Sequence, residues 1–317
     1  MPEKVCWRGD DALPRLTGNK PPMSSVADPG SNSKAMGILC ALAVVALFAG
    51  FTLVSRLGFT TALTVPDIAL LRFGIAGLLL CPVFLKYRLG SLKWHQAAGL
   101  AFTGGLGFAL FAYTGFRLAP ASHGAVLLHG TIPLFTFLII HLTLHESVRR
   151  ARKIGLFLIL AGIVAMAWDS ISGATERQLV GDASLLLAAI CWSVYGVTVK
   201  RLGVPPVHAA SIVATFSMVC FVPVYFLLPG KALHLVGWRD IVAQGAFQGV
   251  LLGVVSIFVY TRAVASLGAQ ETALFTAAVP CITTVLAVFL LGEMPSSAAL
   301  LGVFTVTAGM AIALRKT

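Results

Sequence analysis

Charged side chains are scarce in this sequence, since Asp, Glu, Lys and Arg make up only 11% of its 317 residues. A soluble globular domain has about 25%, so the composition argues against a water-soluble fold. Acidic residues are the scarcest, with 12 Asp and Glu against 23 Lys and Arg, which gives a net charge of +11. The basic residues lie mainly beside apolar segments, which indicates membrane anchoring and argues against a nucleic-acid partner.

The sequence also lacks the motifs of common enzymes and metal proteins. It has six cysteines, five of them inside apolar segments, and no C-x-x-C pair, which argues against a disulfide or metal framework. No P-loop, G-x-S-x-G or H-E-x-x-H occurs, which argues against ATP-driven pumping and common hydrolases. His141 and His145 have metal-like spacing beside Glu146, but no further ligand is nearby. We therefore predict that the protein is not an enzyme and that it has no catalytic residues, metal or cofactor.

Apolar residues dominate what remains, at 58% of the chain with a mean hydropathy of +0.91. Because about 20 apolar residues span a bilayer, the sequence predicts an all-α polytopic membrane protein with ten transmembrane helices. Residues 1–34, which precede the first span, are polar, and this composition predicts a disordered cytoplasmic tail. The predicted spans are 35–55, 66–85, 96–116, 120–142, 153–169, 181–201, 207–229, 240–261, 268–291 and 297–315.

The distribution of Lys and Arg among the loops predicts the orientation. With the N-terminus inside, seventeen of the 23 basic residues fall on the cytoplasmic side and five on the other, while Arg72 lies within a span. Without the tail the ratio is still twelve to five. Both termini are therefore predicted to be cytoplasmic.

The chain contains one long internal repeat. The segment from Ala119 to Glu146 returns 147 residues later, so that Pro280 matches Pro133 and Glu293 matches Glu146. This predicts two five-helix repeats, 35–169 and 181–316. Because five is odd, the second repeat is expected to enter the membrane inverted, an architecture found in secondary transporters. Further matched positions are Tyr113 with Tyr260, Thr136 with Thr283, Gly155 with Gly302, and Gly162 with Gly309.

These features resemble the EamA family of the drug/metabolite transporter superfamily. The resemblance rests on ten spans in two copies, on residues 71–73 (Leu-Arg-Phe) in the second span, and on the two stretches that run from proline to glutamate. It implies a secondary transporter of the cytoplasmic membrane, usually an exporter of amino acids, related metabolites or drugs. The first span departs from the family's frequent Trp-Gly step, because residues 47–50 read Leu-Phe-Ala-Gly.

Two prolines lie near the middle of the fourth and ninth predicted spans. Pro133 and Pro280 each free the carbonyl four residues earlier, on His129 and Thr276 respectively. One interpretation, which we favour, is that these carbonyls and their side chains line a substrate cavity. The other is a packing kink in which water or a neighbouring hydroxyl satisfies the carbonyl.

Four ionisable side chains are candidates for a substrate or proton pathway. His129 lies deep in its span, where a proton relay competes with a hydrogen-bonded packing role. His123 and Glu271 lie near helix starts, where a headgroup position is the favoured alternative. For Arg72 we favour a side chain that snorkels to the outer interface over a counter-charge for a substrate carboxylate.

Four aromatic residues complete the candidates. Trp192 and Tyr195 are three residues apart on one face of the sixth span and are expected to line the cavity. Tyr113 and Tyr260, which match in the repeat, are expected in the aromatic belts at the membrane interfaces.

The sequence thus predicts a transporter that exports amino acids or related small metabolites by alternating access. A sugar-phosphate or nucleotide-sugar exchanger is the alternative within transport, although it calls for several buried Lys or Arg. A membrane enzyme acting on lipids is the alternative of another class. Proton coupling and a homodimer stay open, and the only partners predicted are the substrate and the bilayer.

Overall fold

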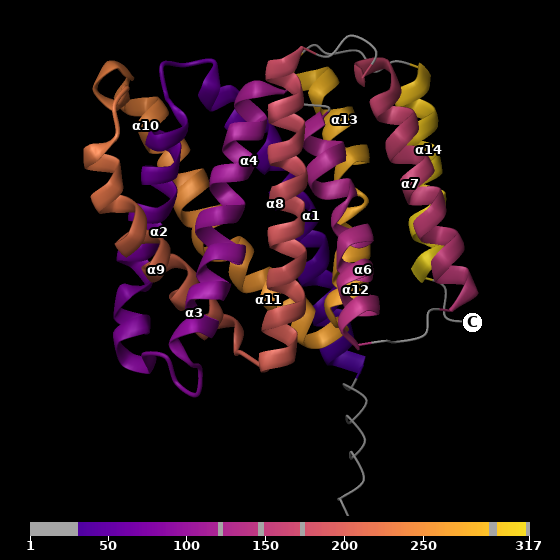
Figure 1. Cartoon of the computed structure of the whole chain (residues 1–317), viewed down its shortest axis with the longest axis horizontal. Helices are drawn as coiled ribbons and strands as arrows, with labels where there is room; N and C mark the ends of the chain where they lie inside the picture. Colours follow the sequence, from indigo (N-terminus) through magenta and orange to yellow (C-terminus); the bar gives the residue numbers. More distant parts are fainter. Residues whose placement is uncertain (1–30, 120–122, 145–148, 172–174, 292–296, 315–317) are drawn as a thin grey trace, which may run out of the picture.

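The computed structural model describes residues 31–119, 123–144, 149–171, 175–291 and 297–314, and every regular element in them is helical (Figure 1). Helix α1 begins at Ser31. The other elements are α2 (Val65–Tyr87), α3 (Trp94–Ala101), η1 (Phe102–Leu106), α4 (Gly107–Leu118), η2 (Gly124–Gly130), α6 (Ile132–Leu144), α7 (Arg150–Ile171), α8 (Glu176–Leu202), α9 (Pro206–Leu227), η3 (Leu233–Leu235), α10 (Trp238–Gln244), η4 (Gly245–Val255), α11 (Ser256–Leu267), α12 (Ala269–Thr276), α13 (Val279–Leu291) and α14 (Ser297–Leu314), with α1 ending at Phe59.

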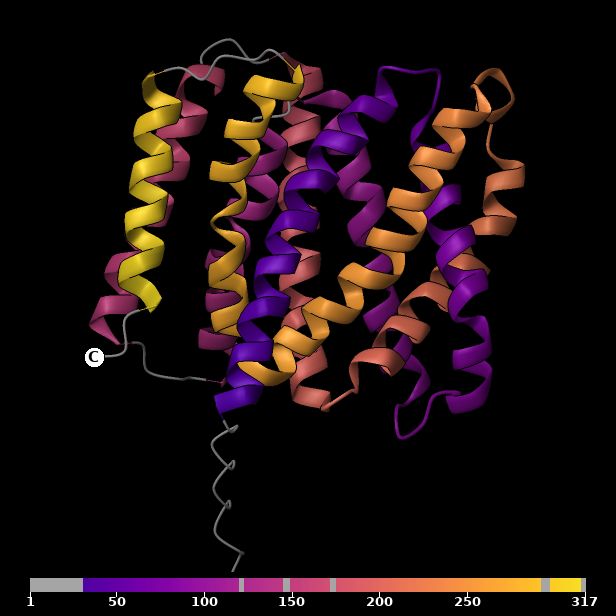
Figure 2. The same cartoon turned by 180° about the vertical axis from the view of Figure 1, so that it is seen from behind.

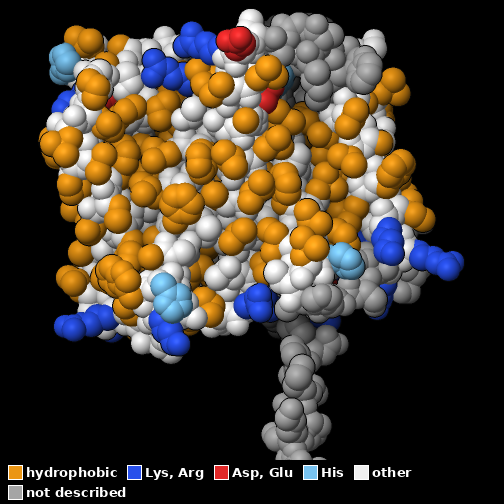
Figure 3. Space-filling model, in the orientation of Figure 1, with side chains coloured by type: hydrophobic (Ala, Val, Ile, Leu, Met, Phe, Trp, Pro, Cys, Tyr) orange, Lys and Arg blue, Asp and Glu red, His pale blue; other side chains and the backbone are white. Residues whose placement is uncertain are grey.

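Each predicted span coincides, to within a few residues, with one of these helical stretches. In the described part of the chain, eight stretches are long and apolar enough to cross a membrane. The fifth and tenth predicted spans correspond to α7 and α14, which pack against each other. On the face that Figure 3 shows, apolar side chains cover the middle of the molecule, and Lys and Arg gather towards its two ends. Large side chains such as Leu227 and Phe289 are exposed, which is typical of a surface that faces lipid.

Local sequence explains where the helices begin and end. Helix α2 starts with Pro66 in its first turn, and the side chain of Asp67 accepts a hydrogen bond from the backbone N–H of Thr64, which satisfies an otherwise free donor. Helix α8 ends at Gly203, whose φ of 61° is a left-handed conformation that glycine adopts without steric cost.

The contacts between helices come in corresponding sets. Helix α4 packs against α8, and its counterpart α11 packs against α1. Helix α12 packs against α6, and correspondingly η2 packs against α13. The second helices of the two halves, α2 and α9, pack against each other, as do the fifth, α7 and α14. This reciprocity is what a two-fold relation between the halves requires, since each contact then has a counterpart with the halves exchanged.

The α7–α14 contact shows the same reciprocity at the level of atoms. A methyl group added to Gly162 would lie 2.8 Å from the carbonyl oxygen of Gly302 and 2.9 Å from the nitrogen of Val306. One added to Gly309 would lie 2.7 Å from the carbonyl oxygen of Gly155 and 2.9 Å from the nitrogen of Ile159. These are the matched positions of the repeat, and only glycine lets the two backbones approach so closely.

The first helices of the two repeats start on opposite sides of the bundle. Helix α1 starts at the lower side of the bundle in Figure 1, whereas α8, the first helix of the second half, starts at the upper side. The beginning of α1 and the end of α14 lie on the same side, which Figure 2 shows from behind.

The fourth and ninth helices are interrupted near their middle. Thr131 separates η2 from α6, and Ala277 and Ala278 separate α12 from α13. Pro133 and Pro280 each lie in the first turn of the helix that follows the interruption, where the missing N–H costs no helical hydrogen bond. Glu146 and Glu293, which end the repeated stretches, lie outside the described residues, and so does His145.

Candidate functional site

A cluster of buried aromatic side chains lies where seven helices meet near the middle of the bundle. We call it the central cluster. Trp192 is at its centre, with ring centroids 4.5 Å from Phe108, 4.7 Å from Tyr260 and 5.3 Å from Phe48 and Tyr195. Its other members are Phe51, Arg72, Tyr113, His129 and Thr276, and every member is at most 2% exposed.

Arg72 belongs to this cluster and does not snorkel, so the favoured expectation for it was wrong. Its side chain is 2% exposed. The guanidinium lies 5.4 Å from the ring centroid of Phe51 and 5.8 Å from that of Phe108, which places it in cation–π contact with both. No carboxylate among the described residues pairs with it, although a buried charge costs several kcal/mol unless it is paired.

His129 and Thr276 meet at the two helix interruptions. The carbonyl of His129, four residues before Pro133, accepts a hydrogen bond of 3.2 Å from the hydroxyl of Thr276, which also donates to the carbonyl of Ala273. A neighbouring hydroxyl therefore satisfies this carbonyl, as the packing interpretation expects. The two residues are matched positions of the repeat, so each half contributes the same position to this contact.

Several buried polar atoms of the cluster have no hydrogen-bond partner among the described residues. They are the indole nitrogen of Trp192, the hydroxyl of Tyr260, both ring nitrogens of His129 and the Nη1 atom of Arg72. An unpaired buried polar group costs about 1–3 kcal/mol. The hydroxyls of Thr136 and Thr283, matched positions one turn beyond the prolines, are unpartnered too. Together these donors and acceptors can stabilise a small polar ligand that enters the cluster.

Tyr113 and Tyr260 are not in interfacial belts, and that expectation was wrong. Both are fully buried. The hydroxyl of Tyr113 donates to the side chain of Gln248, which in turn donates to the hydroxyl of Ser55 and to the side chain of Gln244. Trp192 and Tyr195 share a buried face of α8, as expected, and the hydroxyl of Tyr195 is 2.7 Å from that of Thr261.

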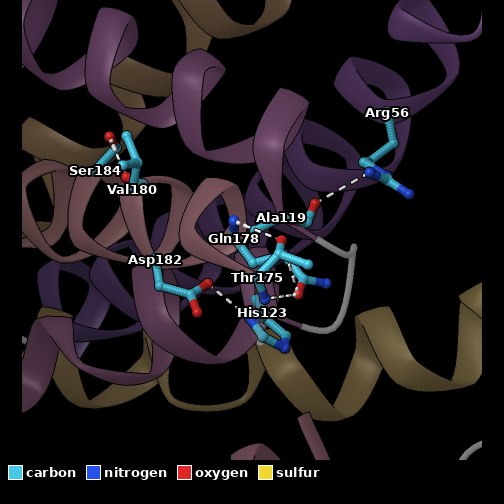
Figure 4. A network of polar contacts seen from close by, with 8 residues as sticks. All are labelled: Arg56, Ala119, His123, Thr175, Gln178, Val180, Asp182 and Ser184. Carbon is cyan, nitrogen blue, oxygen red and sulfur yellow. Dashed lines mark hydrogen bonds and ion pairs between the residues drawn. The ribbon is translucent and has the colours of Figure 1, made fainter. Parts of the chain in front are cut away.

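His123 lies apart from the central cluster, at the end of the bundle where α4 ends and α8 begins, and Figure 4 shows it pointing to Asp182. It precedes η2, is 4% exposed, and its Nδ1 atom lies 2.6 Å from the Oδ1 atom of Asp182 in α8. Nearby, Arg56 donates to the backbone carbonyls of Phe116 and Ala119 and so joins α1 to the end of α4. The His123–Asp182 contact connects the first half of the chain to the second.

Glu271 lies in the first turn of α12, at the end of the bundle opposite to His123. These two candidate residues therefore do not meet. The preceding residue, Gln270, is the position that matches His123 in the repeat. Its side chain accepts a hydrogen bond from the guanidinium of Arg152 in α7. At each end of the bundle, a polar contact between the two halves therefore involves this same repeat position.

Sequence reasoning missed several of these residues. Asp182 is a carboxylate at the second residue of the sixth predicted span, and an ionisable side chain within a span is by itself a signal of function. Gln270 could have been found as the repeat partner of His123. No sequence signal distinguishes Phe48, Phe51 and Phe108 from the phenylalanines that face lipid.

Comparison with known proteins extends this description. Residues 35–168 and 179–315 match the family model of the EamA-like transporter family. Two relatives, the uncharacterized transporter YyaM of Bacillus subtilis (strain 168) and an uncharacterized transporter of Clostridium kluyveri (strain ATCC 8527 / DSM 555 / NBRC 12016 / NCIMB 10680 / K1), are each 23% identical over 196 and 194 residues. In each case the alignment covers 59% of this chain and 62% of the relative.

A solved crystal structure shares the fold. It has a TM-score of 0.66 and 23% sequence identity, over 89% of this chain and 98% of the other. Because the two family matches together cover most of the sequence, and its helices can span a membrane, this chain belongs to the EamA-like transporter family of multi-pass membrane proteins.

Proposed function

We propose that this member of a transporter family is a secondary transporter of the cytoplasmic membrane that exports amino acids or related small metabolites. In this proposal all ten predicted helices cross the bilayer, as two inverted five-helix repeats (35–169 and 181–316), with both termini in the cytoplasm. The reciprocal helix contacts and the opposite directions of α1 and α8 support the inverted arrangement.

The central cluster is the proposed substrate site. Its buried and unpaired Arg72 supports it most, because the carboxylate of an amino acid or a related acid is the counter-charge that a guanidinium binds best. The rings of Trp192, Tyr195 and Tyr260 would contact the rest of the substrate, and the nitrogens of His129 would hydrogen-bond its polar groups.

Alternating access would use the polar contacts at the two ends. The His123–Asp182 contact closes one end and the Arg152–Gln270 contact closes the other. Opening one while the other stays closed would expose the central cluster to one side at a time, with the contact between His129 and Thr276 near the pivot. His123 belongs to the proposed substrate or proton pathway, because it is a buried ionisable side chain at a contact between the two halves.

A sugar-phosphate or nucleotide-sugar exchanger fits the central cluster less well. A doubly charged phosphate needs several cations, and Arg72 is the cluster's one cation among the described residues. The carboxylate substrate is therefore the proposal that we carry forward.

Flux measurements test the proposal. Untargeted metabolite profiles of overexpressing and deletion cells would nominate substrates, and right-side-out vesicles would then measure their flux. We expect Arg72→Gln to abolish flux of a carboxylate substrate at unchanged protein abundance. Arg239→Gln, which alters an exposed arginine over Trp238, is the matched control and should transport normally. Equal flux for Arg72→Gln and the unmodified protein would refute the role of Arg72.

A further inference from the structure

A cavity of about 240 Å³ lies at the end of the bundle where Glu271 is found. It is bounded by the end of α8, the start of α7, α6, and the junction between α11 and α12. We call it the basal pocket. Drug-sized ligands occupy about 300–1,000 Å³, so this space suits a smaller molecule or a single headgroup. Its lining residues are Ile140, Arg152, Val197, Lys200, Arg201, Leu267, Gly268, Ala269, Gln270 and Glu271.

The charges that line the basal pocket are predominantly positive. Arg152, Lys200 and Arg201 face one carboxylate, Glu271. The Nζ atom of Lys200 donates to the carbonyl of Ala265, and Arg152 donates to Gln270. Within the described part of the chain, no ion pair joins Glu271 to any of these cations.

The backbone adds to this positive character. Helix α12 begins at the pocket, with Gly268 at its N-cap. The first N–H groups of a helix have no partner inside the helix, and the helix dipole places partial positive charge there. These N–H groups add to the positive potential that the three cationic side chains produce in the basal pocket.

The basal pocket is separate from the central cluster. A second and much smaller space, of about 10 Å³, shares Arg152 and Gln270 with it and reaches Pro133 and Leu274. That volume holds about one water molecule. A ligand in the basal pocket is therefore in a different site from one bound at Arg72.

We propose that the basal pocket binds a small oxyanion, a carboxylate or phosphate group, independently of the central cluster. Arg152, Lys200 and Arg201 bind it, since guanidinium and ammonium groups both form charge-assisted hydrogen bonds with such oxygens. Glu271 opposes a second negative charge and so limits the affinity. The anion comes either from a dissolved molecule or from the headgroup of an anionic lipid, because basic pockets between helices bind both.

Thermal unfolding of the purified full-length protein tests this proposal, because a ligand that binds only the folded state raises Tm. Inorganic phosphate is the soluble probe, with sodium chloride at matched ionic strength as reference. Nanodiscs with and without phosphatidylglycerol form the lipid arm. We expect a rise in Tm with phosphate or with phosphatidylglycerol beyond that of the reference, and whichever probe acts identifies the source of the anion. A response to neither probe overturns the proposal.

Variants then locate the site. The combined substitution Arg152→Gln, Lys200→Gln and Arg201→Gln should weaken the response about tenfold or more. Lys200→Gln with Arg201→Gln, at two exposed positions, provides the test if the triple variant does not fold. The matched control is Arg150→Gln with Lys153→Gln, two exposed cations of the same helix turn outside the pocket, which should respond normally. An equal loss in control and pocket variants overturns the proposal.

Two further variants complete the design. Glu271→Gln removes the opposing charge and should strengthen the response about threefold; a weaker response overturns the role given to Glu271. Arg72→Gln should retain the response, because it alters only the central cluster. Loss of the response in this variant would mean that the anion binds at the central cluster and would overturn the proposal. Since binding is measured without flux, failure of this proposal and failure of the transport proposal are separate results.

Discussion

The two ends of the bundle use the same position of the repeat for different chemistry. At one end His123 contacts Asp182, and at the other its repeat partner Gln270 contacts Arg152. The backbone geometry is shared, since both residues lie where the fourth or ninth helix begins. The first contact joins an imidazole to a carboxylate, whereas the second joins a guanidinium to a neutral amide. Duplication has thus preserved the packing of the two halves and left their ends free to differ.

The largest expected effect is that of Asp182→Asn. It leaves the buried His123 without its carboxylate, and a hydrogen bond to a charged group contributes about 1.5–3 kcal/mol. We expect a lower Tm in detergent and loss of most transport, about tenfold or more if the full contact free energy is lost. Asp240→Asn, at an exposed position near the same side, is the control and should change neither quantity.

The α7–α14 contact tests the opposite case, in which the two halves carry the same residue. Gly162→Ala and Gly309→Ala each push a methyl group against backbone atoms at matched positions. Each should destabilise the protein by about 1–3 kcal/mol, and the two losses should be equal. Thermal or chemical unfolding measures this. Gly99→Ala, where the added methyl group meets no atom within 4 Å, should not destabilise; a similar loss there would contradict the explanation by close packing.

Gln270→Ala should have a smaller effect, because it removes one hydrogen bond to a half-buried arginine. The closed state should lose about 0.5–1.5 kcal/mol of stability, which favours opening of the end that contains Arg152. The accessibility of a cysteine introduced at the fully buried Ala273 measures this opening. We expect its labelling by a membrane-impermeant thiol reagent to become several-fold faster. Unchanged labelling would show that the Arg152–Gln270 contact does not close this end.

The smallest effect is expected for His123→Gln, which places glutamine at this repeat position in both halves. Glutamine can still donate to Asp182, so stability and transport at pH 7 should change by less than about threefold. Thermal unfolding in detergent and vesicle flux measure the two quantities, and a loss as large as that of Asp182→Asn would contradict this explanation.

Much of the helical framework could be predicted from the sequence. Apolar length predicted the helical stretches, and the offset of 147 residues predicted which positions correspond. Pro133 and Pro280 predicted where the fourth and ninth helices are interrupted, because proline lacks the N–H that a helix needs. The three-residue spacing of Trp192 and Tyr195 predicted that they share a face.

The depth and direction of polar side chains could not be predicted in this way. Arg72 was expected at the interface and Tyr113 in a belt, yet both are buried in the centre. In a soluble helix the apolar face points to the core, but a membrane helix is apolar on the lipid side as well as on the core side. Its periodicity therefore does not say which side faces inward.

By itself, the sequence determined a membrane protein of α-helices with two related halves, because hydrophobic length and internal similarity are properties of the chain alone. Only the tertiary structure decided which residues meet. It brought Arg72 to the aromatic rings, His129 to its repeat partner Thr276, His123 to Asp182, and Arg152 to Gln270. Each of these contacts joins residues at least 21 positions apart, so helix packing and not local spacing determines them.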